Sequence, residues 1–477
     1  MTLIGGVVVH DGHGRRWSGL RIEGDRVAEL LSAAPSGAIV DFGGAHLLPP
    51  LVDTHLHLVA IGQARLMVDA RRSRTLDALG AALRDVSADE TGTRFALHFE
   101  STRQTPDPEW FDTIGGRVVL LTPDLHAAWV SPQVFLDAGV TADSPDPIGG
   151  AFQRTASGGL SGYVLDSALD VLSVRFATDD PVRTKRFLKV GISACESAGL
   201  HEVHEIATTP TMWRALRELA VDGALGLNVC CYGFGDREAW LNEDLSAVGR
   251  LGFCGFKVFL DGAMGSRGAW LSEPYSDARG NRGACLCSAE ELARWWQTAN
   301  ALNLQLACHA IGDEAVTLAL DGARGCEDRL RIEHAQIVKP SDRSRFRGVV
   351  AAMQPHHRRD DAEILESRLG ERAHWAFPFE ALRHAGATVC FGSDAPVSNL
   401  SPLEGMAAAA EAGVSDPLRG YTLEAMRASR AGRSGAIEPG APADFTVVNV
   451  APGRSGGRVL ERWRDGEALA SESRILA

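Results

Sequence analysis

The central part of the chain alternates short apolar segments with amphipathic ones. Segments such as "GFKVFL" and "RLRIEHA" are typical of buried strands, whereas "AEELARWWQTANAL" and "DEAVTLALDGA" have the apolar spacing of helices. The separation between His309 and His334 fits one strand–helix repeat, and that between His334 and Asp394 fits two. Such alternation favours parallel strands joined by helices, so the sequence predicts the α/β class.

One stretch is too long for this repeat. The chain between His57 and Lys257 exceeds the two or three repeats expected between an early and a middle strand. We therefore predict a large insert at about 63–186, where turn-rich segments such as "TPDPEW" and "TADSPDPIGG" occur.

Both ends of the chain consist of short β-like segments separated by turns. Residues 1–48 contain "LIGGVVVHDG" and "GLRIEGDRVAEL", and residues 437–477 contain "APADFTVVNV". Neither piece alone buries an adequate face, so we predict one small β-sandwich domain built from both termini. Two unrelated edge flaps are the alternative. The catalytic domain would then span residues 49–436.

Composition restricts the partners and the compartment. A net charge of −13 argues against nucleic acid and anionic membranes as partners, because such polyanions bind proteins that present a positive field. The N-terminus lacks the features of a signal peptide and there is no run of 18 apolar residues, so we expect a cytoplasmic protein. Nine cysteines without paired CxxC motifs fit reduced core residues better than a disulfide framework.

A pair of histidines ends the segment "LLPPLVDTHLHL". Pro49 and Pro50 exclude a helix interior, and in a strand Asp53, His55 and His57 point to the same face. Two imidazoles at one strand end can bind a metal ion, although the motif alone favours a pair of satisfied core or surface histidines. The segment "HEVHE", residues 201–205, fails the zincin spacing.

Further polar residues follow the later strands. Lys257, His309, His334 and Asp394 each lie near the carboxyl end of a predicted strand, where the loops of a barrel meet. A bare ammonium buried in "GFKVFLDG" is costly, so Lys257 needs a partner or a modification.

Ordered blocks of sequence resemble a known family. "LLPPLVDTHLHL", "GFKVFLDGAMGSRGAWLSEPYSD", "CHAIGDEAV", "RIEHAQIV", "MQPHH" and "GSDAPVSNLSPLEG" are similar to the signature blocks of the amidohydrolase superfamily. The chain most resembles its amidohydrolase-3, or YtcJ-like, branch, which includes N-substituted formamide deformylase. The resemblance spans nearly the whole chain and implies a distorted (β/α)8 TIM barrel with a binuclear metal site.

The resemblance also implies the metal ligands. His55, His57 and Asp394 would hold the more buried ion, and His309 and His334 the more exposed one. Lys257 matches the family lysine that becomes carbamylated and bridges both ions. Two divalent ions are expected, with zinc first and iron, manganese or nickel as alternatives. The implied reaction is attack by metal-activated hydroxide on a carbonyl, with Asp394 moving the proton to the leaving nitrogen.

Other residues are expected around this site. Arg267, with Ser266, would meet a substrate carboxylate or else lie on the surface, and Gln354, His356 and His126 match rim positions of the family. Asp313 is expected to N-cap the following helix, with a bond to a ligand histidine as the alternative. Asp53 would either orient one of the paired histidines or be a structural carboxylate. The chain departs from the family at Pro50, where glycine is usual, and at Ser131, where asparagine is common.

We therefore expect a metal-dependent hydrolase of non-peptide C–N bonds that acts on a small molecule: an amide, an N-substituted formamide or a cyclic amide. A mononuclear deaminase, which would not require Lys257, is the nearest alternative. A catalytically silent ligand-binding or scaffold protein is another, although such proteins usually lose ligands and all six are present here. The resemblance also admits a homodimer.

Overall fold

The computed structural model describes residues 1–35, 40–89, 91–100, 105–122, 127–148, 150–174 and 180–469. The chain divides into two compact units. Unit 1 comprises Met1–Leu58 and Ile192–Ala477, and unit 2 comprises Val59–Gly191.

Unit 1 contains a barrel of parallel strands, eight of them among the described residues. Their order in the sheet is β6 (Leu51–Leu56), β13 (Leu200–Thr208), β14 (Asn228–Gly233), β15 (Leu251–Phe259), β16 (Gln305–Ala310), β17 (Leu330–His334), β18 (Val350–Met353) and β19 (Thr388–Phe391). Several of these strands are buried along their whole length, as parallel strands covered by helices require. The predicted distorted TIM barrel is confirmed.

The distortion lies where the barrel closes between β19 and β6. In place of a regular ladder, the two strands join just beyond their carboxyl ends. The Asp394 amide donates to the His55 carbonyl at 2.7 Å, and the His57 amide donates to the Ala395 carbonyl at 3.0 Å. The carboxylate of Asp53 spans the same junction, because Oδ1 accepts from the amides of His55 and Ser393 at 3.1 and 3.0 Å.

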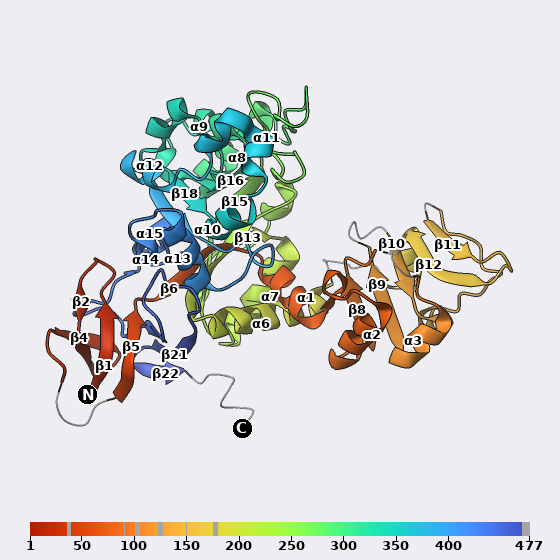
Figure 1. The fold of residues 1–477 in the computed structure, drawn as a ribbon, viewed down its shortest axis with the longest axis horizontal. Helices are drawn as coiled ribbons and strands as arrows, with labels where there is room; N and C mark the ends of the chain where they lie inside the picture. Colours follow the sequence, from red (N-terminus) through yellow and green to blue (C-terminus); the bar gives the residue numbers. More distant parts are fainter. Residues whose placement is uncertain are drawn as a thin grey trace. The chain divides into compact units, whose positions relative to one another are not determined.

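Helices surround the barrel, and Figure 1 shows α8 and α9 outside β15 and β16. Ser288 caps α8 by accepting from the Glu291 amide, and buried Trp295 and Trp296 provide its apolar face. The α-helices are α7 (Pro210–Val221), α8 (Ala289–Ala301), α9 (Asp313–Gly322), α10 (Pro355–Asp360), α11 (Leu365–Leu369), α12 (Phe379–His384), α13 (Pro402–Glu411), α14 (Pro417–Gly420) and α15 (Leu423–Ala428). The 3-10 helices are η2 (Glu238–Trp240), η3 (Glu327–Arg329), η4 (Pro340–Phe346) and η5 (Gly370–Trp375).

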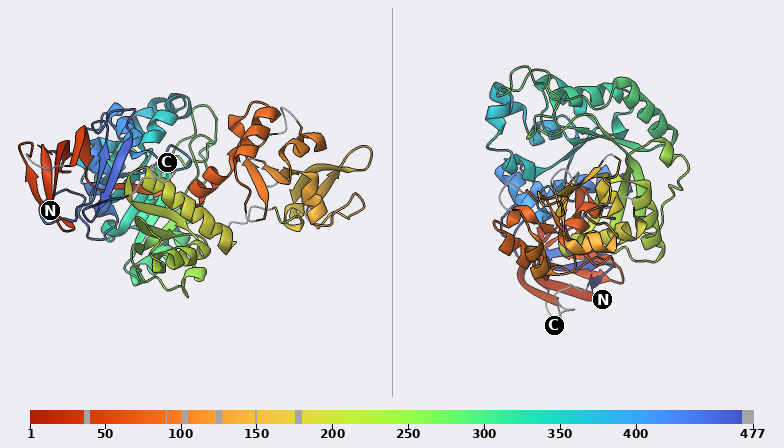
Figure 2. Two further views of the ribbon diagram at one scale, coloured as in Figure 1. Left: turned by 90° about the horizontal axis from the view of Figure 1, so that it is seen from below. Right: turned by 90° about the vertical axis from the view of Figure 1, so that its right-hand side faces the viewer.

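The two chain ends build one β domain, in which N-terminal and C-terminal strands lie side by side (Figure 2). Its described strands form a single hydrogen-bonded sheet that joins the ends through antiparallel pairing of β5 with β20. The strands are β1 (Thr2–His10), β2 (Arg16–Trp17), β3 (Gly19–Glu23), β4 (Arg26–Leu31), β5 (Val40–Leu48), β20 (Phe445–Val448), β21 (Val459–Arg464) and β22 (Glu467–Leu469).

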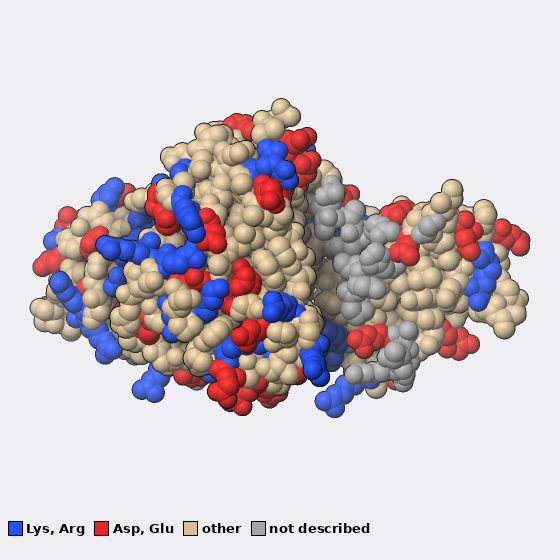
Figure 3. Space-filling view, turned by 90° about the horizontal axis from the view of Figure 1, so that it is seen from above, with Lys and Arg blue, Asp and Glu red and all other residues tan. Residues whose placement is uncertain are grey.

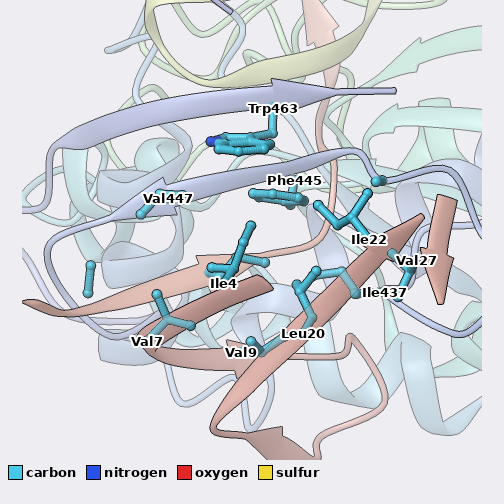
Figure 4. Packing of buried hydrophobic residues seen from close by; sticks show 13 residues of the cluster. Ile4, Val7, Val9, Leu20, Ile22, Val27, Ile437, Phe445, Val447 and Trp463 are labelled. Atoms are coloured by element: carbon cyan, nitrogen blue, oxygen red, sulfur yellow. The ribbon is translucent and has the colours of Figure 1, made fainter. Parts of the chain in front are cut away.

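Residues from both ends share the core of this domain. In Figure 4, Ile4 and Leu20 from the N-terminal strands lie with Phe445 and Trp463 from the C-terminal ones. The rings of Phe445 and Trp463 stack with their centroids 5.2 Å apart. The sequence predicted a small β-sandwich built from both termini. A β domain built from both termini is present, and its described strands form one hydrogen-bonded sheet.

Unit 2 has its own sheet and core, and the insert expected at about 63–186 falls within it. Its core includes Leu79, Leu83, Trp110, Phe111 and Val118. Its strands are β7 (Val68–Asp69), β8 (Thr93–Leu97), β9 (Arg117–Leu121), β10 (Ala127–Val130), β11 (Gly150–Arg154) and β12 (Leu160–Asp166). The helices of this segment are α1 (Leu58–Leu66), η1 (Ala70–Arg72), α2 (Leu76–Asp85), α3 (Pro108–Ile114), α4 (Pro132–Asp137), α5 (Ser167–Val171) and α6 (Pro181–Ser197).

One expectation about the cysteines is wrong. Cys230 on β14 and Cys254 on β15 form a disulfide, so this pair is not reduced. The barrel places β14 beside β15 and brings the two Cα atoms to 5.7 Å, a proximity that their spacing in the sequence does not reveal.

The surface carries charges of both signs. On the face drawn in Figure 3, acidic and basic side chains are interspersed. Within the described part of the chain, no helix has the length and apolar character needed to cross a bilayer.

The closure of the barrel at Gly392 is testable. A Cβ atom at this position would lie 2.4 Å from the His55 nitrogen and 2.8 Å from the His55 Cβ. We expect Gly392→Ala to lower the free energy of unfolding by about 1–3 kcal/mol, because backbone must shift to admit it. Gly252→Ala on β15 is the matched control, since its Cβ would meet nothing within 4 Å. Urea denaturation measures both, and equal stabilities would contradict the tight junction.

Candidate metal centre

The six candidate ligands come from five strands of the barrel and lie at its carboxyl end. They are His55 on β6 and His57 just after it, Lys257 on β15, His309 on β16, His334 at the end of β17, and Asp394 in the loop after β19. All are buried except His57, whose side chain is partly exposed. The fold thus brings together side chains that are far apart in the sequence.

Three of these residues form a compact cluster. Ligand atoms of His55, His334 and Asp394 all lie within 4.8 Å of one another, close enough to hold one cation. The Oδ1 atom of Asp394 lies 3.4 Å from Nε2 of His55 and 3.2 Å from Nε2 of His57. The two imidazoles of the His-x-His motif therefore meet the same carboxylate oxygen.

The other candidate ligands adjoin this cluster. The rings of His309 and His334 have centroids 4.6 Å apart, and those of His55 and His334 are 4.9 Å apart. The Lys257 ammonium lies over the ring of Phe259, 4.9 Å from its centroid, and the same ring packs against His309.

Two ligand histidines have carboxylates directly behind them. Nδ1 of His55 lies 2.6 Å from Oε2 of Glu333, and Nδ1 of His309 lies 2.9 Å from Oδ1 of Asp261. A carboxylate at Nδ1 keeps the proton on that nitrogen and leaves the Nε2 lone pair for a cation. Asp261 is itself fixed, because it accepts from the Gly312 amide at 2.7 Å.

A third carboxylate lies near His57. Oε1 of Glu205 is 4.0 Å from Nδ1 of His57, and its Oε2 accepts from the Leu58 amide at 2.5 Å. Glu205 belongs to the "HEVHE" segment on β13. That segment therefore contributes to the site through its final glutamate, without forming a zincin motif.

Glu333, Asp261 and Glu205 are not among the site residues predicted from the sequence. Each had a local signal: Glu333 directly precedes His334, Asp261 follows the Lys257 strand within "FLDG", and Glu205 is the last residue of "HEVHE". Strand alternation could have directed Glu333 into the barrel, but which histidine it meets depends on the pairing of distant strands.

Asp53 and Asp313 bind groups other than the imidazole rings. Asp53 accepts backbone amides at the β6–β19 junction, as described above, and burial raises its pKa to about 6. Asp313 is the first residue of α9, with Gly312 at the N-cap, and its carboxylate accepts from the Ser272 amide at 3.1 Å. The carboxylate at Nδ1 of His309 is that of Asp261.

His357 faces the cluster, and its neighbour His356 does not. Nε2 of His357 lies 3.6 Å from Oδ2 of Asp394, and its ring lies parallel to that of His334, with a centroid separation of 5.8 Å. Nε2 of His356 instead lies near Gly405 on α13. Gln354 is buried and donates to the Ala352 carbonyl at 3.3 Å.

The remaining predicted substrate contacts are placed as follows. Arg267 forms a two-point ion pair with Asp277, at 3.1 Å from Nε and 2.9 Å from Nη2. Asp277 also accepts from Arg368. The neighbouring Ser266 hydroxyl donates to the Ala263 carbonyl at 3.2 Å. His126 lies outside the described residues.

The charge states of the histidines differ across the cluster. Burial lowers the pKa of both His309 and His334, and neighbouring imidazoles and the Lys257 charge act in the same direction. Asp261 opposes this lowering at His309, and Asp394 opposes it at His334, but neither reverses it. Although burial opposes its charge, the carboxylates of Asp394 and Glu333 raise the pKa of His55. His309 and His334 are thus neutral imidazoles with lone pairs available.

The pKa values of the neighbouring ionisable groups Lys257, Asp394 and Glu333 are also shifted. Burial lowers the pKa of Lys257 to about 8. Burial opposes ionisation of Asp394, but His55 and His57 hold the pKa of its carboxyl well below the usual range. Burial likewise opposes the charge of Glu333, yet Arg331 and His55 lower its pKa.

The residues present fit divalent cations. Imidazole nitrogens and carboxylate oxygens are ligands that zinc and related metals accept. Within the described residues, the buried atoms Nδ1 of His334 and Nε2 of His357 have no hydrogen-bond partner, although both border the cluster. Buried nitrogens without partners are costly, and a cation with its bound water would satisfy atoms of this kind.

Comparisons with known proteins agree with this geometry. Residues 38–468 match the model of the Amidohydrolase family, specifically amidohydrolase-3. The chain is 27% identical to the putative amidohydrolase YtcJ of Bacillus subtilis (strain 168), over 79% of this chain and 75% of the relative. It is 24% identical to N-substituted formamide deformylase of Arthrobacter pascens, over 88% of this chain and 86% of the relative.

A solved structure extends the likeness to the fold. An uncharacterized metal-dependent hydrolase from Pyrococcus furiosus is 26% identical, with a TM-score of 0.76, and the match covers 95% of this chain and 100% of that chain. The match to the family model includes the barrel, the insert and the strands β5, β20 and β21 of the β domain. The chain therefore belongs to the amidohydrolase family, in its amidohydrolase-3 branch.

Proposed function

We propose that this amidohydrolase hydrolyses a non-peptide C–N bond of a small molecule at a centre that binds two divalent cations. The observation that carries the proposal is the cluster of His55, His334 and Asp394, whose ligand atoms lie within 4.8 Å of one another. His57, His309 and Lys257 border that cluster and would complete the ligand sets of the two ions.

The ligand set determines what the site can do. When bound, divalent cations lower the pKa of water from 15.7 to about 7 and polarise carbonyl oxygens, which supplies a nucleophile and an electrophile at neutral pH. His55, His57 and Asp394 would hold one cation, and His309 and His334 the other. Zinc suits these ligands best, and iron, manganese and nickel are alternatives.

Lys257 is suited to bridge the two ions as a carbamate. A free ammonium would repel both cations, and burial, which lowers the pKa of Lys257 to about 8, increases the fraction of the neutral amine at neutral pH. The neutral amine adds carbon dioxide to form an N–C bond and releases one proton. The product is an anionic oxygen ligand in place of a cation.

Asp394 is the residue we assign to proton transfer. Its Oδ1 atom faces Nε2 of both His55 and His57, whereas its Oδ2 atom lies on the side of His357. Oδ2 would accept the proton of the attacking water and deliver it to the leaving nitrogen. The low pKa of the carboxyl keeps Asp394 ionised at neutral pH.

The substrate class follows from the relatives and from the charges at the site. One relative is named as an N-substituted formamide deformylase. Arg267, the residue proposed for a substrate carboxylate, is already paired with Asp277. We therefore favour neutral N-formyl or N-acyl amines over substrates that carry a carboxylate beside the scissile bond.

Metal content and turnover test the reaction class together. We expect elemental analysis of protein purified without chelator to find about two divalent ions per chain. The protein should hydrolyse N-formyl or N-acyl amines, lose activity when a chelator strips it, and recover with Zn²⁺. Absence of bound metal would favour the catalytically silent alternative. Two bound ions with no turnover of any amide would overturn the reaction class.

Lys257→Ala separates the binuclear hydrolase from a mononuclear deaminase. We expect the substitution to reduce the metal content to about one ion and to abolish amide hydrolysis, because the bridge is lost. Lys339→Ala is the control, since Lys339 pairs with Glu314 at 3.3 Å and lies outside the cluster. Full activity of Lys257→Ala with a single ion would favour the mononuclear site.

Asp394→Asn tests the proton-transfer role. The amide cannot take up a proton, so we expect kcat to fall by about 10²–10⁴-fold in variant protein whose metal content has been verified. Asp360→Asn is the matched control, because Asp360 lies on α10 and accepts only from the Ser398 hydroxyl at 2.7 Å among the contacts described. An Asp394→Asn variant with normal kcat would exclude Asp394 as the proton carrier.

A further inference from the structure

A buried ion pair lies beneath the candidate metal centre. Arg331 and Glu333, both on β17, have side chains with no solvent exposure, and Nε of Arg331 donates to Oε1 of Glu333. Because side chains two residues apart on a strand share a face, both point into the barrel interior.

Arg331 joins this pair to three other strands. One guanidinium nitrogen donates to the Thr54 carbonyl on β6, directly before His55. Another lies 2.8 Å from Nδ1 of His204 on β13 and 3.4 Å from the Tyr232 hydroxyl on β14. The guanidinium also lies over the Tyr232 ring, 5.1 Å from its centroid. Four strands of the barrel therefore hold Arg331 in one position.

Glu333 connects the fixed Arg331 side chain to His55, a candidate metal ligand. While Oε1 is held by Arg331, Oε2 lies 2.6 Å from Nδ1 of His55. Nε2 of the same imidazole is 3.4 Å from Oδ1 of Asp394, inside the metal cluster. The contact with Glu333 thus determines both the ring orientation of His55 and the nitrogen that carries its proton.

We propose that Glu333, held by Arg331, is a positioning residue of the metal centre, which fixes His55 with Nδ1 protonated and with Nε2 directed at the cation. This inference rests on the proposed metal-dependent function. The positive charge of Arg331 stabilises the anionic form of Glu333 beside Nδ1 of His55, so that the buried carboxylate is not left unpaired. The expected consequence is tighter cation binding.

A purely structural ion pair is the competing explanation, because the same contacts tie strands together. Glu202 provides a matched control within the same buried network. Its side chain is also fully buried, lies 3.3 Å from Nε2 of His204 through Oε1, and accepts from Arg433 through Oε2. In the described contacts it reaches no candidate metal ligand.

The test measures Zn²⁺ affinity of the full-length protein by competition with a chromophoric chelator. We expect Glu333→Gln to weaken Zn²⁺ binding by about 10–100-fold, because the amide replaces the anionic partner of His55. Glu202→Gln should leave the Zn²⁺ affinity unchanged, even if both variants lower the melting temperature of the metal-stripped protein. Wild-type affinity in Glu333→Gln, or equal losses in both variants, would overturn the proposal.

A second measurement needs no folded Glu333 variant. In Zn²⁺-loaded wild-type protein labelled with ¹⁵N-histidine, the His55 ring, assigned by its loss in His55→Asn, should carry its proton on Nδ1. A proton on Nε2 would overturn the proposal. Wild-type protein that takes up no Zn²⁺ would refute the metal centre itself, whereas Zn²⁺ uptake unaffected by Glu333→Gln would refute only the positioning role.

Discussion

The junction between β6 and β19 is the constraint on which the site depends. Backbone hydrogen bonds between the residues around His55 and Asp394 close the barrel where these two side chains must meet. The Asp53 carboxylate holds both strand ends, and Gly392 leaves the space that lets their backbones approach. The contacts that close the barrel are therefore also the contacts that bring these candidate ligands together.

The site concentrates strain and buried charge that the surrounding structure must offset. His334 and Asp394 adopt left-handed backbone with φ of 72° and 56°, a conformation that costs non-glycine residues on the order of 1–3 kcal/mol each. Carboxylates lie behind His55 and His309, and Arg331 lies behind one of these carboxylates. The carboxylates of Glu333 and Asp261 thus have a guanidinium and a backbone amide beside them, respectively, which makes their burial tolerable.

The β domain is the other part of unit 1, and it is hydrogen-bonded to the barrel. The β domain uses strands from both chain ends, and Thr446 of β20 contacts the barrel by donating to the Gly199 carbonyl at 2.8 Å. The β domain joins the two ends of the chain, and the barrel likewise requires its first and last strands, β6 and β19, to meet. Unit 2 has a hydrophobic core of its own.

The sequence by itself determined the α/β class, the two-ended β domain and the positions of the candidate ligands, because local alternation and motif spacing encode them. Tertiary structure alone decided which groups meet. Glu333 and Asp261 reach different histidines, His357 rather than His356 faces Asp394, Arg267 is paired with Asp277, and Cys230 meets Cys254. These contacts join residues that are not neighbours in the sequence, and their formation depends on strand order and loop conformation that no local pattern specifies.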